Sequence, residues 1–278
     1  MPTVVIVTKN RRERLLATLA ELARLPDRPP VVVVDNASDD GTADAVRRRY
    51  PSVRLIKTGD VGAAARNLGI RAAGTPLVAF SDDDSWWAPG ALSRAAQLFS
   101  AYPALGLIAA GITVEPRGAL DPTCQAMRDT PLDADLALPG PPVLGFLACA
   151  AVARSSAVLA CGGFHGRYGF GGEEHLLAVD LASAGWGLAY VETIAAHHHP
   201  APGPRKWRRT IELRNLFWST WLRRPLPRAA YLTLALTRRR EGGTRALLAA
   251  MRGLPWIVRE RRVVPPRVER SLRALDAS

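Results

Sequence analysis

The stretch Phe80-Ser81-Asp82-Asp83-Asp84-Ser85-Trp86-Trp87 decides how the whole sequence is interpreted. An apolar run, residues 75–80, leads into it, and a helical pattern begins at Pro89 and Gly90 directly after it. A short apolar run bounded by turn residues predicts a buried strand. We therefore expect the three aspartates at the carboxyl end of that strand, where open α/β sheets bind their ligands. The alternative is a solvated acidic turn that caps the next helix.

Strand-like and helical segments alternate through the first hundred residues. Apolar runs predict buried strands at residues 4–8, 31–35, 53–56 and 75–80. Helical patterns lie between them at residues 13–25, 42–49 and 62–73, and another follows at 88–101. This alternation predicts an α/β fold with a mostly parallel, doubly wound sheet. Thr8, Asp35 and the Asp82 group then share one sheet edge, as they would in a nucleotide-binding crevice. The glycine patterns of dinucleotide sites and P-loops are missing from the sequence.

The next hundred residues are less regular. Strands are predicted at 105–114 and 143–152, and the Pro- and Asp-rich segment 115–142 between them is expected to be an irregular loop over the site. A helix is predicted from Gly171-Gly172-Glu173-Glu174 to Ala184, and a short strand at 187–191 precedes the run His197-His198-His199. Acidic residues in a first helical turn also favour the helix dipole, and a histidine run can be a surface cluster. Both groups therefore have a purely structural interpretation as well.

Positive charge is concentrated at the C-terminal end. The 278-residue chain has a net charge of +12, and residues 201–278 hold 19 Lys and Arg against 5 Asp and Glu, a net of +14. Such a length predicts one large domain, or one domain with an appendage. The three cysteines form no CxxC pair and have no metal-binding spacing, so we expect buried thiols in a reducing compartment. The longest apolar stretch, residues 139–153, is shorter than the roughly 20 residues of a spanning helix, so we expect a cytoplasmic protein.

The basic C-terminal part has helical patterns. A helix predicted at 204–224 has an apolar face that also carries Arg214, and this face consists of Trp207, Ile211, Trp218, Trp221 and Leu222. An arginine on such a face needs an anionic partner, either the phosphates of a ligand or a core carboxylate. Further basic helices are predicted within 228–262. Leucine and aromatic surfaces rimmed with arginine suit a peripheral membrane helix, and packing on the catalytic part or on another subunit is the alternative.

Six motifs together resemble those of the family-2 glycosyltransferases, which are nucleotide-sugar-dependent enzymes with the GT-A fold. They are Val7-Thr8-Lys9-Asn10-Arg11, the segment 34–42, Ala65-Arg66-Asn67-Leu68-Gly69, residues 80–84, Gly162-Gly163-Phe164 and Gly172-Glu173-Glu174. The resemblance covers about residues 3–200. It implies a GT-A catalytic domain at 1–200, with a nucleotide-binding half at 1–101 and an acceptor half at 102–200. A basic helical region follows at 201–278.

The resemblance also implies roles on the donor side. By position, Thr8 and Asp35 look like the contacts to the nucleotide base and ribose, and Arg66 looks like a further donor contact. Asp82 and Asp84 look like the outer carboxylates of the DxD motif. Asp83, between them, is expected to serve either the turn or the donor sugar. The donor expected from this family is a UDP- or dTDP-sugar.

A divalent cation, Mg²⁺ or Mn²⁺, is expected with these carboxylates. A nucleoside diphosphate is a poor leaving group until a cation neutralises its charge, and such hard cations prefer carboxylate oxygens. Asp84 is expected to be the direct ligand, and Asp82 to contact the ribose or the waters of the metal. His197 is expected as a further ligand because the family often has a histidine after this strand. In an extended segment His199 shares its face, and spacing does not separate the two.

The reaction implied by the resemblance is inverting transfer of a sugar to a hydroxyl of a glycan or a lipid-linked acceptor. Such a hydroxyl needs a base, and we expect Glu174 in that role with Glu173 orienting it or contacting the acceptor. Glu174 stands where the family usually has Asp, one methylene shorter. The rival interpretation is a non-catalytic module of the same fold that binds a nucleotide-sugar or a glycan. Nucleic-acid binding by the basic tail is not expected, because no recognised motif supports it.

Overall fold

The computed structural model describes residues 1–200, 206–239 and 241–277. Within these ranges nine strands form one sheet in the order β3-β2-β1-β4-β8-β6-β9-β5, and β7 pairs with β6 at its margin. The strands are β1 (Thr3–Thr8), β2 (Val31–Asn36), β3 (Arg54–Thr58), β4 (Leu77–Asp82), β5 (Ser85–Trp87), β6 (Leu105–Val114), β7 (Ala119–Leu120), β8 (Ala151–Arg154) and β9 (Gly187–His198). The predicted α/β fold is confirmed.

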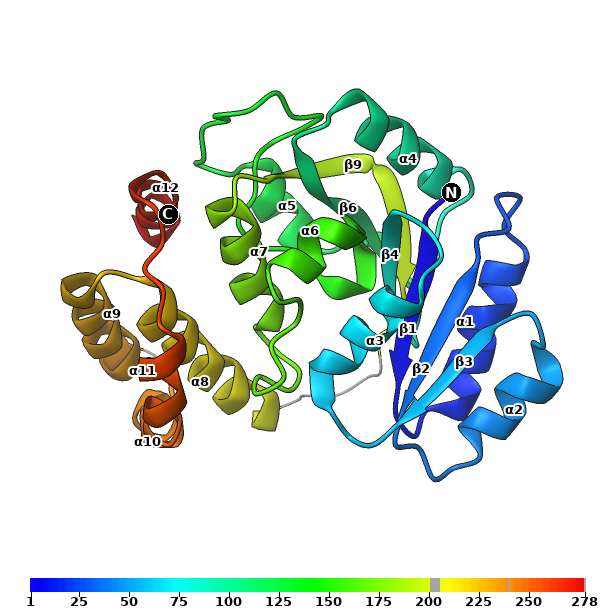
Figure 1. Ribbon diagram of the computed structural model, residues 1–278, viewed down its shortest axis with the longest axis horizontal. Coiled ribbons are helices and arrows are strands. Elements are labelled where there is room, and N and C mark those ends of the chain that lie inside the picture. Colours follow the sequence, from blue (N-terminus) through cyan, green and yellow to red (C-terminus); the bar gives the residue numbers. More distant parts are fainter. Residues whose placement is uncertain (201–205, 240, 278) are drawn as a thin grey trace.

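Helices cover both faces of the sheet. Figure 1 shows α1 and α2 on one side of β1 to β3, and α3 on the other side together with α6 and α7. The helices that connect the strands are α1 (Arg12–Ala23), α2 (Thr42–Arg49), α3 (Ala65–Ala72), α4 (Ala91–Ala101), α5 (Pro122–Arg128), α6 (Ser155–Ala160) and α7 (Glu173–Ser183). Two 3-10 turns, η1 (Gly62–Ala64) and η2 (Ala148–Ala150), precede α3 and β8.

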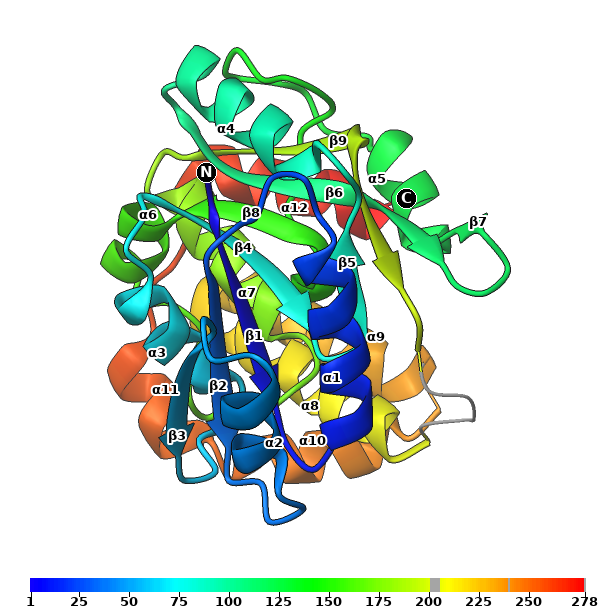
Figure 2. The same ribbon diagram turned by 90° about the vertical axis from the view of Figure 1, so that its right-hand side faces the viewer.

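The parallel half of the sheet follows from its sequence. β1, β2 and β4 are almost continuous runs of Val, Ile, Ala and Phe, as strands covered on both faces require. β1 pairs in parallel with β2 and with β4, so that Thr8 lies opposite Asp35 and Val7 opposite Asp82. Figure 2 shows these strands side by side. The register therefore brings three of the predicted polar strand ends to one edge of the sheet.

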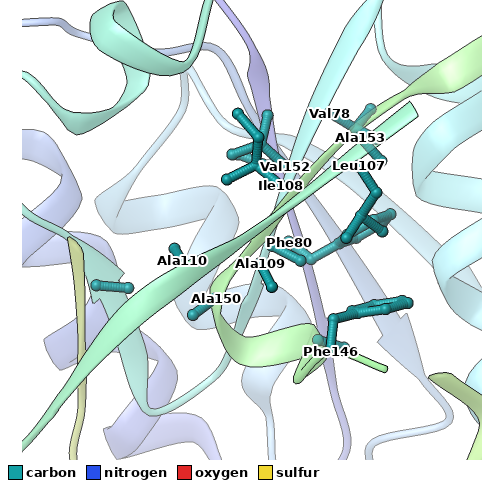
Figure 3. Packing of buried hydrophobic residues seen from close by; sticks show 14 of the residues in the cluster. Val78, Phe80, Leu107, Ile108, Ala109, Ala110, Phe146, Ala150, Val152 and Ala153 are labelled. Atoms are coloured by element: carbon teal, nitrogen blue, oxygen red, sulfur yellow. The ribbon is translucent and has the colours of Figure 1, made fainter. Parts of the chain in front are cut away.

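Beyond β4 the sheet becomes mixed, and its core is closely packed. β8 is antiparallel to both β4 and β6, and small alanines of β8 let Phe80, Leu107 and Ile108 fill the interior (Figure 3). Phe80 is fully buried and makes an edge contact with the ring of Phe164, with the ring centroids 5.3 Å apart. The hydrophobic core thus reaches directly under the turn that carries the aspartates.

Three details differ from the predicted pattern. β5 was not predicted, because its three residues immediately follow the acidic turn. β9 continues to His198, past the predicted end at residue 191. The apolar pattern stops there because Glu192 and Thr193 are exposed at a bulge, where the register of β9 with β6 shifts. The loop predicted at 115–142 contains β7 and α5, and the strand predicted at 143–152 is regular only from Ala151.

Five helices form a separate layer outside α7 (Figure 1). They are α8 (Lys206–Arg223), α9 (Leu226–Arg239), α10 (Gly243–Met251), α11 (Leu254–Glu260) and α12 (Pro266–Ala277). Residues 204 and 205 of the predicted helix lie outside the described residues. Phe217, Trp218 and Leu222 of α8 share a buried cluster with Tyr168 and Leu176. The helices thus pack against the part of the chain that carries the sheet, while the domain division at residue 200 stays a prediction.

Gly69 of α3 is expected to be intolerant of even one added methyl group. A Cβ at this position would lie 2.3 Å from Val5 Cγ1 in the buried contact between α3 and β1. Because neither element can move freely, Gly69→Ala is expected to lower the free energy of unfolding by about 1–3 kcal/mol. Guanidinium denaturation measures this. Gly74→Ala is the control, since a Cβ there meets nothing within 4 Å, and equal stabilities of the two variants would contradict the packing.

Candidate functional site

The predicted acidic turn connects β4 to β5 and is held by Ser85. The Ser85 hydroxyl accepts a hydrogen bond from Asp82 N at 2.8 Å and donates one to Cys149 O at 2.9 Å. The side chain of Asp82 is 38% exposed, whereas Asp83 and Asp84 are only 4% and 5% exposed. The turn is therefore largely buried, and the alternative of a solvated cap does not describe it.

Asp83 faces α1 and the end of β1. Its Oδ2 accepts a hydrogen bond from Thr8 Oγ1 at 2.9 Å, and Arg11 Nη1 lies 2.7 Å from its Oδ1. The Thr18 hydroxyl donates to its backbone carbonyl at 2.9 Å. Burial raises the pKa of Asp83 to about 7, although the charge of Arg11 lowers it. Asp83 thus ties the turn to β1 and α1, and Thr8, predicted at the nucleotide, is bonded to it.

Asp84 is surrounded by positive and hydrogen-bonding groups. Arg11 Nη2 lies 2.5 Å from its Oδ2, His198 Nε2 lies 3.4 Å from its Oδ1, and His199 N donates to its backbone oxygen at 2.8 Å. Burial opposes ionisation, but the bond with His198 and the charge of Arg11 outweigh it and hold the pKa of Asp84 below its usual value. Asp84 therefore remains a carboxylate with one oxygen directed at a histidine.

The pairing of β9 with β5 decides which of the three histidines faces the acidic turn; the alternation of side chains along β9 alone does not. β5 and β9 pair antiparallel, so that Trp86 lies opposite His197 and Ser85 opposite His198. His197 stacks on Trp86 and contacts Glu115 Oε1 through its Nδ1 at 2.9 Å. The structure thus brings His198, and not the expected His197, to Asp84. His199 is exposed and contributes its backbone there.

Arg66 joins the two acidic groups of the site. Its guanidinium is 3% exposed, with Nη1 2.9 Å from Glu173 Oε1 and Nη2 3.0 Å from Asp82 Oδ1. It also lies over the rings of Phe164 and Phe170, 5.2 and 5.3 Å from their centroids. Burial lowers the pKa of Arg66, but the neighbouring carboxylates outweigh it and raise the pKa. Arg66, predicted from the sequence as a donor contact, is a buried bridge across the site.

Glu173 and Glu174 begin α7, and their environments differ. Glu173 is 1% exposed, and both of its oxygens are engaged, Oε1 by Arg66 and Oε2 by Gly171 N at 2.5 Å. Glu174 is half-buried, and burial and the charge of Glu173 raise its pKa. Burial raises the pKa of Cys149, and the charges of Asp82 and Glu174 raise it further. The two neighbouring glutamates thus differ, since both oxygens of Glu173 are engaged by donors whereas Glu174 has a raised pKa.

The glycine-rich loop before α7 is fixed by a residue of the C-terminal helices. Asn215 of α8 is fully buried, and its Nδ2 donates to Tyr168 O at 3.0 Å and to Gly171 O at 2.5 Å. Arg214 donates to the same Tyr168 O at 3.0 Å and lies 4.2 Å from the centroid of Trp218. In the described part of the chain a backbone carbonyl and a ring, rather than the alternative of a core carboxylate, therefore contact Arg214. Sequence reasoning missed Asn215, although an amide on an apolar helix face was a usable signal.

Asp35 lies at the end of β2 and is 1% exposed. Its Oδ1 accepts a hydrogen bond from Ser38 N at 2.8 Å, and its Oδ2 has no hydrogen-bond partner in the part of the chain that the structure describes. A buried carboxylate oxygen without a donor is costly, so it is suited to a donor supplied by a ligand. Asp35, Asp83 and Thr8 lie at the same sheet edge, as predicted.

Comparison with known proteins agrees with this architecture. The family model "Glycosyl transferase family 2" matches residues 3–158. The chain belongs to glycosyltransferase family 2. A curated relative from Mycobacterium tuberculosis, N-acetylglucosaminyl-diphospho-decaprenol L-rhamnosyltransferase, is 30% identical over 233 residues, which cover 71% of this chain and 76% of the relative. The chain is therefore a glycosyltransferase, an enzyme of class EC 2.4, and the predicted family is confirmed while the non-catalytic alternative is not retained.

Solved structures show the same GT-A fold. The mannosyltransferase PcManGT from Pyrobaculum calidifontis, in complex with GDP-Man and Mn²⁺, matches with a TM-score of 0.58 and 21% identity over 99% of this chain and 85% of that one. S. aureus TarS in complex with UDP-GlcNAc matches with a TM-score of 0.60 and 17% identity over 79% of this chain and 66% of that one. The catalytic sheet and its flanking helices therefore follow the GT-A arrangement.

Replacing Arg66 is expected to lower the free energy of unfolding of the protein. Arg66→Met leaves the buried carboxylate of Glu173 without its cation, so the free energy of unfolding should fall by about 3–5 kcal/mol in urea denaturation. Adding Glu173→Gln to this variant removes the unpaired charge and should restore part of the loss. Arg54→Met, at an exposed arginine of β3, is the matched control. A loss at Arg54 as large as that at Arg66 would contradict a special role for the bridge.

Proposed function

We propose that this enzyme transfers a sugar, with inversion, from a UDP- or dTDP-sugar to a hydroxyl of a lipid-linked or glycan acceptor. The observation that carries the proposal is the Arg66 bridge, which holds Asp82 of the donor side and Glu173 of the acceptor side against one buried guanidinium. The name of the mycobacterial relative, which specifies a diphospho-decaprenol acceptor, supports a lipid-linked substrate. The complex of TarS with UDP-GlcNAc supports a uridine nucleotide.

On the donor side, we assign base and ribose recognition to Asp35 and Thr8. The unpartnered Asp35 Oδ2 is a hydrogen-bond acceptor in a buried position, which suits an N–H or O–H of a nucleoside. Thr8 lies opposite Asp35 in the register of β1 and β2 and holds Asp83, so it positions the turn against the same ligand. Asp82, the most exposed of the three aspartates, is assigned to the contact with the ribose.

The residues around Asp84 fit a divalent cation. Asp84 Oδ1 and His198 Nε2 lie 3.4 Å apart, so a carboxylate oxygen and an imidazole nitrogen, two ligand types that Mn²⁺ accepts, would be available to hold one cation. No cluster of three His, Cys, Asp or Glu suited to a metal occurs in residues 1–200, 206–239 and 241–277, so the donor phosphates and water would complete the coordination. A bound cation supplies a Lewis acid that neutralises the diphosphate leaving group. We therefore propose His198 in place of His197 beside Asp84.

On the acceptor side, we propose Glu174 as the general base. Arg66 and Gly171 N already engage both oxygens of Glu173, so its role is to orient the site. Glu174 has a raised pKa, which makes it a stronger base than an ordinary carboxylate once it is ionised.

Replacement of Glu174 tests the proposed reaction. Glu174→Gln should lower kcat for sugar transfer by about 10²–10⁴-fold, because the amide cannot accept the proton of the acceptor. Thermal shifts with UDP- and dTDP-sugars in the presence of Mn²⁺ should remain as in the unmodified enzyme, because donor binding does not use this residue. Glu21→Gln, at a partly exposed position on α1, is the control. Full transfer activity of Glu174→Gln would remove Glu174 from the mechanism.

The pH dependence of transfer should follow the same residue. A base acts only when ionised, and the pKa of Glu174 is raised above its ordinary value of 4.5. Activity should therefore fall as the pH is lowered through this raised pKa, so the acid limb of kcat/KM should lie well above pH 4.5. The limb should move in Glu174→Asp and stay in place in Glu21→Gln. An acid limb at the ordinary carboxylate pKa would contradict the assignment.

A further inference from the structure

The C-terminal helices enclose an apolar groove that the catalytic site does not use. It lies between α9 and α11, with Trp221 of α8 at its base, and its volume is about 570 Å³. Four large aliphatic side chains that line it are nevertheless open to solvent: Leu226, Leu234, Leu254 and Val258 are exposed by 70, 50, 40 and 73%. Exposed apolar side chains gathered in one groove indicate a binding surface rather than ordinary scatter.

The apolar surface continues onto α10. Leu247 lines the groove, while Met251 and Leu248 are 49% and 63% exposed. At about 100° per residue, these three side chains follow one another around the helix from the groove towards Arg252 and Arg245. The apolar strip is thus bordered by arginines on the same helix.

Positive charge around this surface has few internal partners. In the described part of residues 201–278, Glu241, Glu260, Glu269 and Asp276 each form ion pairs with basic residues. Several exposed arginines within or at the end of α9, α10 and α11 have neither an ion pair nor a side-chain hydrogen bond within the described residues, namely Arg238, Arg245, Arg252 and Arg259. These arginines belong to the three helices that carry the exposed aliphatic side chains, so charge complementarity favours an anionic partner there.

Exposed aliphatic side chains beside unpaired arginines favour one kind of partner over the others. A symmetric second copy would bring the same arginines together, and like charges would oppose the contact. A nucleic acid would satisfy the arginines but would leave the leucines and valine in water. An anionic lipid surface satisfies both, since aliphatic side chains insert below the headgroups and arginines pair with the phosphates. No described helix is long and apolar enough to cross a bilayer, so contact would be made from one side.

We propose that the face formed by α9, α10 and α11 docks on an anionic lipid bilayer, with Leu226, Leu234, Leu254 and Val258 inserted and the unpaired arginines at the headgroups. The inference deepens the proposed function, because a bilayer is where a lipid-linked acceptor resides. It names the surface that would hold the enzyme beside that acceptor.

Vesicle sedimentation of the full chain tests the docking surface. The enzyme should sediment with vesicles of phosphatidylglycerol and phosphatidylethanolamine, and much less with pure phosphatidylcholine. Leu234→Glu with Val258→Glu should weaken binding to the anionic vesicles by roughly tenfold or more, because two inserted aliphatic groups become charged. Arg245→Ala and Arg252→Ala should each weaken it by about fivefold. Leu120→Glu, at an exposed leucine of β7, is the matched control and should bind normally.

The outcomes separate this inference from the proposed function. Donor-induced thermal shifts should be unchanged in the groove variants, which shows that they fold. Binding of the Leu234/Val258 variant equal to that of the unmodified enzyme would overturn the proposal, and so would an unmodified enzyme that stays in the supernatant. Light scattering that shows a dimer dissociated by the same substitutions, without vesicle binding, would assign the groove to self-association and overturn it too. Vesicle binding needs neither donor nor acceptor, so a failure of sugar transfer is recorded independently.

Discussion

The buried guanidinium of Arg66 is the interaction on which the site depends. It lies where three separate parts of the chain meet: the end of β4, the start of α7, and the aromatic pair Phe164 and Phe170. A buried cation is tolerated only when carboxylates and hydrogen bonds satisfy it, and a buried carboxylate only when a cation is near. The acids and Arg66 thus make one another's burial possible, and the two ends of the site are held at a fixed spacing.

The turn that carries the aspartates has a second support in strand pairing. β5 has only three residues, yet its pairing with β9 decides which histidine faces Asp84. Ser85 ties the turn to the core below it through Cys149 O. Arg11, in the loop before α1, adds a positive charge that pairs with both Asp83 and Asp84. The turn is therefore held by the core on one side and by Arg11 on the other. The acidic turn is thus shaped mainly by neighbours that are distant in sequence.

These contacts explain what the sequence could and could not reveal. β1, β2, β4 and β6 were predictable because their apolar runs are long and uninterrupted, and the polar residues at their ends were identified for the same reason. The gathering of Thr8, the aspartates, Arg66 and Glu173 followed from their motifs. The choice of His198 over His197 required the register of β5 with β9, which alternation within one strand cannot supply. Asn215 and Arg214 act through backbone carbonyls of a distant loop, and no sequence pattern specifies such partners.

The hydrogen bonds from Asn215 to the loop before α7 determine how far the chain can be shortened. The last strand of the sheet ends at His198, and a chain cut just after it would retain every acid of the site. It would also lose the amide that holds Tyr168 O and Gly171 O, and with it the anchor of the glycine whose N–H donates to Glu173. A fragment that ends after β9 would contain Glu173 and Glu174, but only a longer fragment that includes α8 would hold the loop before them in place.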